Sequence, residues 1–188
     1  TSAYSAVNIA GPNARKVLAK VCSDIDLSSE AFPYMGVREG SVAGIPARVI
    51  RVGFVGELGY EVHIPQHCGE ALWDALICAG AEFSIKPFGI EAQRILRLEK
   101  GHIIIGQDTD AMSNPEEVQM GWAIAKKKPF FVGGRSIQEL NKTPLKRSLV
   151  GFVINDLKAP IPLESHLVLD GDRMTGRVTS CNFSPTLN

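Results

Sequence analysis

The segment RVGFVGELGYEVHIP, residues 51–65, places glycines and two glutamates among apolar residues that otherwise alternate as in a β-strand. Tyr60, Val62 and Ile64 look like the packed face of a sheet. Glu61 stands between them as a charged residue in a segment that otherwise reads as a packed strand. From these residues alone, a solvent-facing glutamate on a hairpin is the favoured interpretation.

Other side chains suited to metal binding or acid–base chemistry give weaker signals. His63 and His67 are four residues apart, but Pro65 lies between them and the segment reads as a strand, so hydrogen-bonded or solvated histidines are favoured over metal ligands. Asp108 and Asp110 in GQDTD are candidate carboxylates, although turn bonds explain such residues more often than acid–base work does. The usual phosphate-binding, dinucleotide-binding, zinc-protease and serine-hydrolase motifs are missing.

The cysteines and lysines carry no stronger pattern. No two cysteines have CxxC spacing and each lies among apolar or small residues, so buried free thiols are favoured over zinc ligands or disulfides. The four cysteines are Cys22, Cys68, Cys78 and Cys181. Three consecutive lysines in AKKKPFF are expected to be solvated, with a bound anion as the alternative. No metal site is expected.

Helical periodicity identifies three elements in the first half of the chain, within residues 11–21, 67–82 and 89–101. The first two helices should bury Ala14, Val17, Leu18 and Val21, and Leu72, Ala75, Leu76 and Ala79, respectively. The third helix has Glu91 in its first turn and Lys100 before Gly101, the order of charges that the helix dipole favours, with a glycine at its end.

Strands are predicted around the first helix. The opening residues TSAYSAVNIA are strand-like, and residues 37–65 read as strands broken at Gly44-Ile45-Pro46 and from Gly56 to Gly59. Such breaks predict antiparallel hairpins. Together with the helices, the hairpins predict an α+β fold, an antiparallel sheet with packed helices.

The pattern changes after Gly101. The run GHIII is strand-like and is followed by polar, irregular sequence as far as Trp122, while residues 126–142 predict an extended approach to a short helix. From Lys146 onward, SLVGFVI and HLVLDGDRMTGRVTS predict about three or four strands of an all-β unit, with a turn at Asp170-Gly171. So few strands cannot close a barrel, and we expect the chain to be a piece of a longer polypeptide.

These patterns predict three parts. We expect an α+β domain over residues 1–115, a crossing segment over 116–145 and the start of an all-β, barrel-like domain over 146–188.

Composition and charge restrict the class of partner. The chain has 188 residues, 45% of them hydrophobic, which is ordinary globular composition. Lys and Arg together number 20, as do Asp and Glu, so the net charge of zero offers no attraction for nucleic acid or an anionic membrane. No apolar run reaches the roughly 18 residues of a membrane span, and no secretion signal is visible. A cytoplasmic location and a small-molecule or protein partner are expected.

Several ordered motifs carry a resemblance to a known family: RVGFVGELGYEVHIP, ALWDAL, GIEAQRILRLEKG, GQDTD, MGW, FFVGGRSI and GRVTSCNFSPTLN. Over essentially the whole chain they resemble the folate-binding aminomethyltransferase family, typified by the T-protein of the glycine cleavage system. Within that family, LRLEKGHIIIGQDTD is most similar to the C-terminal region of the α subunit of heterotetrameric sarcosine oxidase.

The resemblance assigns a role to Glu61. In the family, the second acid of the motif corresponding to GELGYE binds the pterin ring of tetrahydrofolate, which presents an amide N–H beside an exocyclic amine. A carboxylate can accept both bonds at once. Phe54 matches an aromatic residue near the same pocket, where ring contact with a flat heterocycle is worth about 1 kcal/mol beyond burial.

The third helix and the segment after it match the family less closely. The T-protein pattern has an arginine that contributes to the folate site near the position of Gln93, whereas this chain has Arg94 one residue later, and one residue rotates a helical side chain by about 100°. Arg94 is thus a candidate that cannot simply inherit the role. Arg97 and Glu99 match the pattern and are expected to be structural. Trp122 and Lys126 fall, by a loose alignment, where the family's chain crosses toward the folate cavity.

The family's presumed proton-handling aspartate lies upstream of the segment matching NIAGPNARKVLAK. No catalytic residue can therefore be assigned here, and we expect the 188 residues alone to be inactive. Their expected role is to bind tetrahydrofolate in an enzyme that transfers a methylene unit to it from an oxidised N-methyl amino acid. Flavin and NAD are expected only on other parts of a sarcosine oxidase-like complex, whose other subunits are the expected partners. The alternatives are a T-protein-like aminomethyltransferase and a non-catalytic folate-binding module.

Overall fold

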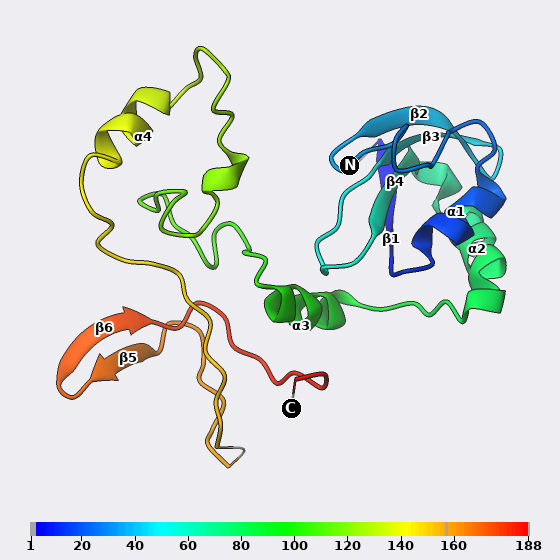
Figure 1. Cartoon of the computed structure of the whole chain (residues 1–188). Coiled ribbons are helices and arrows are strands. Elements are labelled where there is room, and N and C mark those ends of the chain that lie inside the picture. Colours follow the sequence, from blue (N-terminus) through cyan, green and yellow to red (C-terminus); the bar gives the residue numbers. More distant parts are fainter. Residues whose placement is uncertain (1–2, 157, 188) are drawn as a thin grey trace. The chain divides into compact units, whose positions relative to one another are not determined.

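A computed structural model describes residues 3–156 and 158–187 of the chain (Figure 1). The chain forms two compact units, unit 1 from Thr1 to Lys100 and unit 2 from Gly101 to Asn188. Each unit is described by itself.

Unit 1 is built on a four-stranded antiparallel sheet with the order β1-β4-β3-β2. Its strands are β1 (Tyr4–Ala10), β2 (Val37–Val42), β3 (Ile45–Ile50) and β4 (Gly59–Pro65). In β4, Tyr60, Val62 and Ile64 are fully buried while Glu61 and His63 are partly exposed. Because successive side chains of a strand point to opposite faces, one face of the sheet forms the core and the other presents Glu61.

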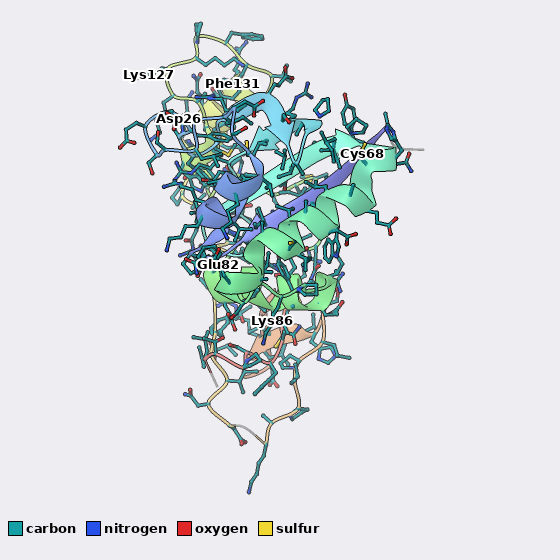
Figure 2. All side chains as sticks on the ribbon, turned by 90° about the vertical axis from the view of Figure 1, so that its right-hand side faces the viewer. Asp26, Cys68, Glu82, Lys86, Lys127 and Phe131 are labelled. Atoms are coloured by element: carbon teal, nitrogen blue, oxygen red, sulfur yellow. The ribbon has the colours of Figure 1, made fainter. Side chains whose placement is uncertain are left out.

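Two helices cover the core face of this sheet (Figure 1). These are α1 (Ala14–Val21) and α2 (Gly69–Gly80), and α2 is flanked by short 3₁₀ turns at Gln66–Cys68 and Ala81–Phe83. Figure 2 shows Cys68 and Glu82 at the two ends of α2. The faces of α1 and α2 that were predicted to be buried pack against the core. The buried residues on them are Ala14, Val17, Leu18, Leu72 and Leu76. The α+β fold predicted from the sequence is confirmed.

The turn between β2 and β3 lies earlier than the sequence predicted. Ala43 and Gly44 have φ values of 53° and 75°, and Val42 lies opposite Ile45. Two left-handed residues form the tight turn that suits a two-residue hairpin, so Ile45 and Pro46 already belong to β3 and the predicted break at them is wrong. The second break is wider than predicted, because β3 ends at Ile50 and the loop occupies residues 51–58.

The third predicted helix is α3 (Ile90–Lys100). Gly101 follows it with φ 78°, the left-handed conformation in which glycine ends a helix. This confirms the predicted stop.

Unit 2 has less regular structure over its described residues. It contains a 3₁₀ turn η3 (Gly121–Ala123), the short helix α4 (Gly134–Leu140) and a hairpin of β5 (Leu167–Asp170) and β6 (Arg173–Arg177). The short helix and the hairpin turn at Gly171 were predicted. Of the about three or four strands expected beyond Lys146 from the sequence pattern, the described residues form these two.

Two strand-like runs are not strands. After Gly101, the carbonyl of Ile104 accepts the backbone N–H groups of Gln107 and Asp108, so the apolar run ends in a turn. The run SLVGFVI, residues 148–154, is bound to a loop and not to a strand: Leu149 N–H donates to the carbonyl of Glu117, and Gln119 Nε2 donates to the carbonyl of Leu149. The first run therefore ends in a turn, and Leu149 of the second run bonds to a loop about thirty residues earlier in the chain instead of to a neighbouring strand.

None of the helices in the described part of the chain has the length and apolar character needed to cross a membrane.

Candidate functional site

Glycines shape the loop that leads into β4. A Cβ atom on Gly59 would lie 2.7 Å from the carbonyl oxygen of Val52 and 3.3 Å from Cα of Gly53, so the two ends of the loop approach too closely for any side chain at residue 59. Gly56 has φ 83°, and a Cβ there would lie 2.7 Å from the Lys100 side chain of α3. Close backbone packing therefore favours glycine at residue 59, and the positive φ favours glycine at residue 56.

Glu61 lies in β4, an inner strand of the sheet, on the face opposite the core. It is directly opposite Asn8 of β1 and Ile50 of β3. Its side chain is 41% exposed, and its Oε2 lies 3.3 Å from Nε2 of His63. The structure thus supports the sequence-based view that Glu61 is not part of the core, and it gives the carboxylate one side-chain neighbour along its own strand.

One of the cross-strand partners of His63 is a cation that is already paired with a glutamate. Arg48 and Ala6 are its cross-strand partners. Nε and Nη2 of Arg48 lie 3.1 and 2.7 Å from Oε1 of Glu39 on β2. The hydrogen bonds that Arg48 donates to Glu39 raise the pKa of its guanidinium, so Arg48 stays charged at neutral pH. Arg48 therefore has its own acidic partner on this face.

Phe54 lies half-buried in the loop of residues 51–58, seven residues before Glu61. The same unit contains Arg94 on α3, which is exposed and has Nη1 3.5 Å from Oε1 of Glu91. Gln93 is half-buried and Arg97 is buried, in keeping with a structural role for Arg97. Pterin contact by Phe54 and ligand contact by Arg94 stay predictions.

The other two candidate residues lie in unit 2. Trp122 is in η3 with its side chain 67% exposed. Lys126 lines a hollow of about 260 Å³, together with Lys128, Phe131 and residues of α4. Figure 2 labels Lys127 and Phe131, which lie in the chain between η3 and α4. Ligand contact by Trp122 and Lys126 also stays a prediction.

Asp108 is a structural carboxylate within unit 2. Its side chain is buried, and it accepts hydrogen bonds from Ile104 N at 2.8 Å and from the hydroxyls of Thr179 and Ser180, both at 2.6 Å. Gln107 beside it donates to Glu164 Oε1 at 2.6 Å. The bonds from Thr179 and Ser180 to Asp108 join GQDTD to the TS of GRVTSCNFSP.

Asp110 lies in the same loop as Asp108 and is more exposed. Hydrogen bonds from the Ser113 side chain and the Met112 backbone lower the pKa of its carboxyl, and Arg147 and Arg177 lower it further. Guanidinium nitrogens of Arg147 and Arg177 lie 3.7 and 3.6 Å from its two oxygens. Turn bonds from Ser113 and Met112 account for Asp110, whereas Asp108 combines one turn bond from Ile104 with long-range bonds from Thr179 and Ser180.

The described residues contain no cluster of ligating side chains that could hold a metal ion. His67 is exposed in the 3₁₀ turn after β4, and Pro65 ends the strand as expected. All four cysteines are free thiols, as predicted. Only Cys22 is buried, which raises the pKa of its thiol, and the expectation that Cys78 is buried is wrong because it lies on the exposed side of α2.

Sequence analysis missed the contact between His63 and Glu61. The signal was available in the period of two along β4, which puts both residues on one face. The sequence favoured a hydrogen-bonded or solvated His63 but did not identify Glu61 as its partner.

Comparison with known proteins gives two family matches. Residues 1–128 match the GCVT N-terminal domain, and residues 147–188 match the glycine cleavage T-protein C-terminal barrel domain. The second match confirms that an all-β, barrel-like domain begins in this part of the chain. The exact boundaries at residues 115 and 146 stay predictions of the sequence.

Relatives come from two groups of enzymes. The chain is 38% identical to the sarcosine oxidase subunit alpha of Corynebacterium sp. (strain P-1), over 100% of this chain and 20% of that protein. It is 33% identical to the aminomethyltransferase of Halothermothrix orenii, over 98% of this chain and 50% of that protein. The chain thus spans about half the length of the aminomethyltransferases it matches and about a fifth of this alpha subunit.

A solved structure shares the fold. It is the glycine cleavage system aminomethyltransferase T from Bartonella henselae, which is 28% identical and has a TM-score of 0.60, over 75% of this chain and 37% of that one. Together with the motifs GELGYE and GQDTD and the sheet that carries Glu61, these matches show that the chain belongs to the GCVT aminomethyltransferase family.

Proposed function

We propose that this chain binds tetrahydrofolate through Glu61, as part of a protein like the sarcosine oxidase alpha subunit. The observation that carries the proposal is the position of Glu61: a carboxylate on an inner strand, 41% exposed, on the sheet face opposite the core. A buried carboxylate could not reach a ligand, and one on a frayed hairpin would not be held in place. Sequence similarity to sarcosine oxidase alpha subunits supports the choice of protein.

The chemistry of the side chains fits a pterin. The amide N–H and exocyclic amine of the pterin are adjacent donors, and a carboxylate accepts two parallel bonds in that geometry. Phe54, in the loop that precedes β4, offers a ring for contact with the flat heterocycle. Arg94, Trp122 and Lys126 are proposed as further contacts to the ligand.

When bound, tetrahydrofolate supplies the nucleophilic nitrogen N5, which captures the methylene carbon of an oxidised N-methyl amino acid. The residues of this chain would bind and orient the ligand and exclude water from it. Holding two reactants in alignment can supply most of the rate acceleration in such a transfer. Flavin and NAD belong to other parts of the proposed complex, and its other subunits are the proposed partners, in the cytoplasm.

A second candidate function is aminomethyl transfer from a lipoyl carrier, as in a T-protein. It is favoured by the relatives named aminomethyltransferase, and by the solved aminomethyltransferase T with the same fold. A third is a folate-binding module without activity. The complete gene discriminates between them, because a dinucleotide-binding domain upstream indicates sarcosine oxidase, and its absence from a chain of roughly T-protein length favours the transferase.

Substitution of Glu61 tests the proposal in the intact protein. Glu61→Gln replaces one acceptor oxygen by a donor, and a hydrogen bond to a charged group is worth about 1.5–3 kcal/mol, so we expect the affinity for 5-formyltetrahydrofolate, an air-stable analogue, to fall about 10- to 100-fold. The affinity is measured by titration calorimetry. The melting temperature should change little, because the side chain is partly exposed.

Glu57→Gln is the matched control. Glu57 belongs to the same GELGYE motif and is exposed in the loop, so its substitution should leave the affinity unchanged. Equal affinities of the wild type and the Glu61→Gln variant would refute the assignment of Glu61.

A further inference from the structure

The contact between His63 and Glu61 has no place in the function proposed so far. Nε2 of His63 lies 3.3 Å from Oε2 of Glu61, and the His63 side chain is only 29% exposed. An ionised carboxylate can only accept hydrogen bonds, so the bond between them is one in which Nε2 of His63 carries the hydrogen and donates it. This bond is available to the neutral imidazole in one tautomer and to the imidazolium.

The other neighbours of Glu61 do not hold its carboxylate. Its cross-strand partner Ile50 has an apolar side chain, and Asn8 on the other side makes no side-chain hydrogen bond to it among the described residues. Arg48, the cation directly opposite His63 on β3, is bonded to Glu39. Within the part of the chain that the structure describes, His63 is therefore the side chain that hydrogen-bonds to the Glu61 carboxylate.

One bond from His63 leaves capacity for a ligand. The two oxygens of a carboxylate offer about four acceptor sites, and His63 uses one of them, on Oε2. The other sites, on both oxygens, remain open to a pair of donors. A bond to one oxygen also limits rotation of the carboxylate about its last side-chain torsion, which is otherwise broad.

We infer that His63 is a positioning residue, which sets the orientation of the Glu61 carboxylate for the two pterin donors. The inference rests on the proposed function, because it gives His63 a role only where Glu61 binds the ligand. His63 would act through Glu61 and not by touching the ligand. Pre-orienting a binding group raises affinity because less freedom is lost on binding.

Two substitutions of similar length separate the hydrogen bond from packing. His63→Gln can place an amide N–H near the position of Nε2, whereas His63→Met fills similar space without a donor. In the intact protein, calorimetry with 5-formyltetrahydrofolate should show affinity about tenfold weaker for His63→Met and within about twofold of the wild type for His63→Gln, given the strength of a bond to a charged acceptor. Melting temperatures of both variants are measured alongside.

The same substitutions in the Glu61→Gln background complete a double-mutant cycle. There, His63→Met should cause no further loss, because the carboxylate that it positions is gone. Equal affinities of the His63→Met and His63→Gln variants, whether both normal or both weak, would overturn the inference. It would also be overturned if His63→Met weakened ligand binding as much in the Glu61→Gln background as in the wild type. If Glu61→Gln itself leaves the affinity unchanged, the proposed function fails first and the inference fails with it.

Discussion

Unit 1 and unit 2 are held together by different interactions. Every buried hydrophobic side chain of the described structure lies in unit 1, between Ile9 and Leu76. In unit 2 the buried side chains are polar: Asp108, Thr109 and Asn114. Unit 1 is thus stabilised by the burial of apolar surface, and the described part of unit 2 by polar bonds between loops.

The polar bonds of unit 2 join segments far apart in sequence. Arg147 Nε donates to Glu117 Oε2 at 3.0 Å, and Arg147 Nη2 donates to the carbonyl of Met112 at 3.1 Å. Asp108 accepts from Thr179 and Ser180, about seventy residues later in the chain. The exposed bonds of Arg147 each contribute little net free energy, because water can replace either partner, whereas the bonds to Asp108 are made to a buried carboxylate.

The apolar core, which unit 1 has and the described part of unit 2 lacks, explains why the proposed binding residue Glu61 lies in unit 1. A site must hold its side chains closely, and strands packed on a core do so better than loops. Glu61 and His63 alternate in β4 with three fully buried residues, so the core fixes the strand that carries them. We therefore expect the pterin-binding end of the proposed site to be the rigid part of the chain.

The contrast between the two units predicts that a substitution in the core of unit 1 has the largest effect on stability. Leu18 is fully buried under the sheet of unit 1, whereas Leu169 on β5 of unit 2 is 58% exposed. Leu18→Ala should lower the free energy of unfolding of unit 1 by about 2–5 kcal/mol, because it leaves a cavity. Leu169→Ala should change unit 2 by no more than about 0.5 kcal/mol.

The two tryptophans allow each unit to be followed separately. Trp73 lies on α2 in unit 1 and Trp122 in η3 in unit 2, so variants that keep only one tryptophan report urea unfolding of one unit by fluorescence. If Leu169→Ala destabilised unit 2 as much as Leu18→Ala destabilises unit 1, unit 2 would have an apolar core of its own and the contrast would be wrong.

Much of unit 1 could be predicted from the sequence because its elements have clear periodicity. Ala14, Val17 and Leu18 recur with helical spacing and are buried, and the end of α3 at Gly101 follows from the conformational freedom of glycine. The alternation along β4 also predicted which face of the strand is packed. Each of these features is decided by local sequence and by burial against one core.

The rest could not be predicted because it depends on partners distant in sequence. The apolar run after Gly101 has the pattern of a strand, but Asp108 bonds to its backbone and is itself fixed by residues 179 and 180. At the site, the sequence predicted Glu61 but not how its carboxylate is held. Whether Arg94, Trp122 and Lys126 meet one ligand depends on tertiary arrangement, which periodicity does not specify.

Removal of the Asp108 carboxylate should have the second largest effect, and only in unit 2. Asp108→Ala leaves the backbone N–H of Ile104 and the hydroxyls of Thr179 and Ser180 without their acceptor. Loss of a buried partner costs about 1–3 kcal/mol, so the Trp122 transition should move to lower urea while the Trp73 transition stays in place. Asp172→Ala, an exposed aspartate in the turn between β5 and β6, is the control and should leave both unchanged. Movement of the Trp73 transition by Asp108→Ala would show that this network also stabilises unit 1.

Acid should loosen unit 2 before unit 1. Hydrogen bonds lower the pKa of Asp110 below its ordinary 3.8 and that of Glu117 below its ordinary 4.5, with Arg147 contributing to both. When the pKa is lower in the folded state, the unfolded state takes up protons first as the pH falls. The stabilisation is therefore present above the ordinary values and is lost as the pH falls through the folded ones.

Asp26 provides the matched case in unit 1. Hydrogen bonds from Ser28 lower its pKa in the same way, but its neighbours Ile25 and Leu27 are buried in the core. Between about pH 6 and pH 3, amide protection factors of residues 110–120 should fall while those around Asp26 persist, because apolar burial does not titrate. Asp110→Asn should flatten the pH dependence in unit 2, since an amide carries no charge at either pH. Equal loss of protection around both aspartates would show that the two units depend on their carboxylates to the same degree.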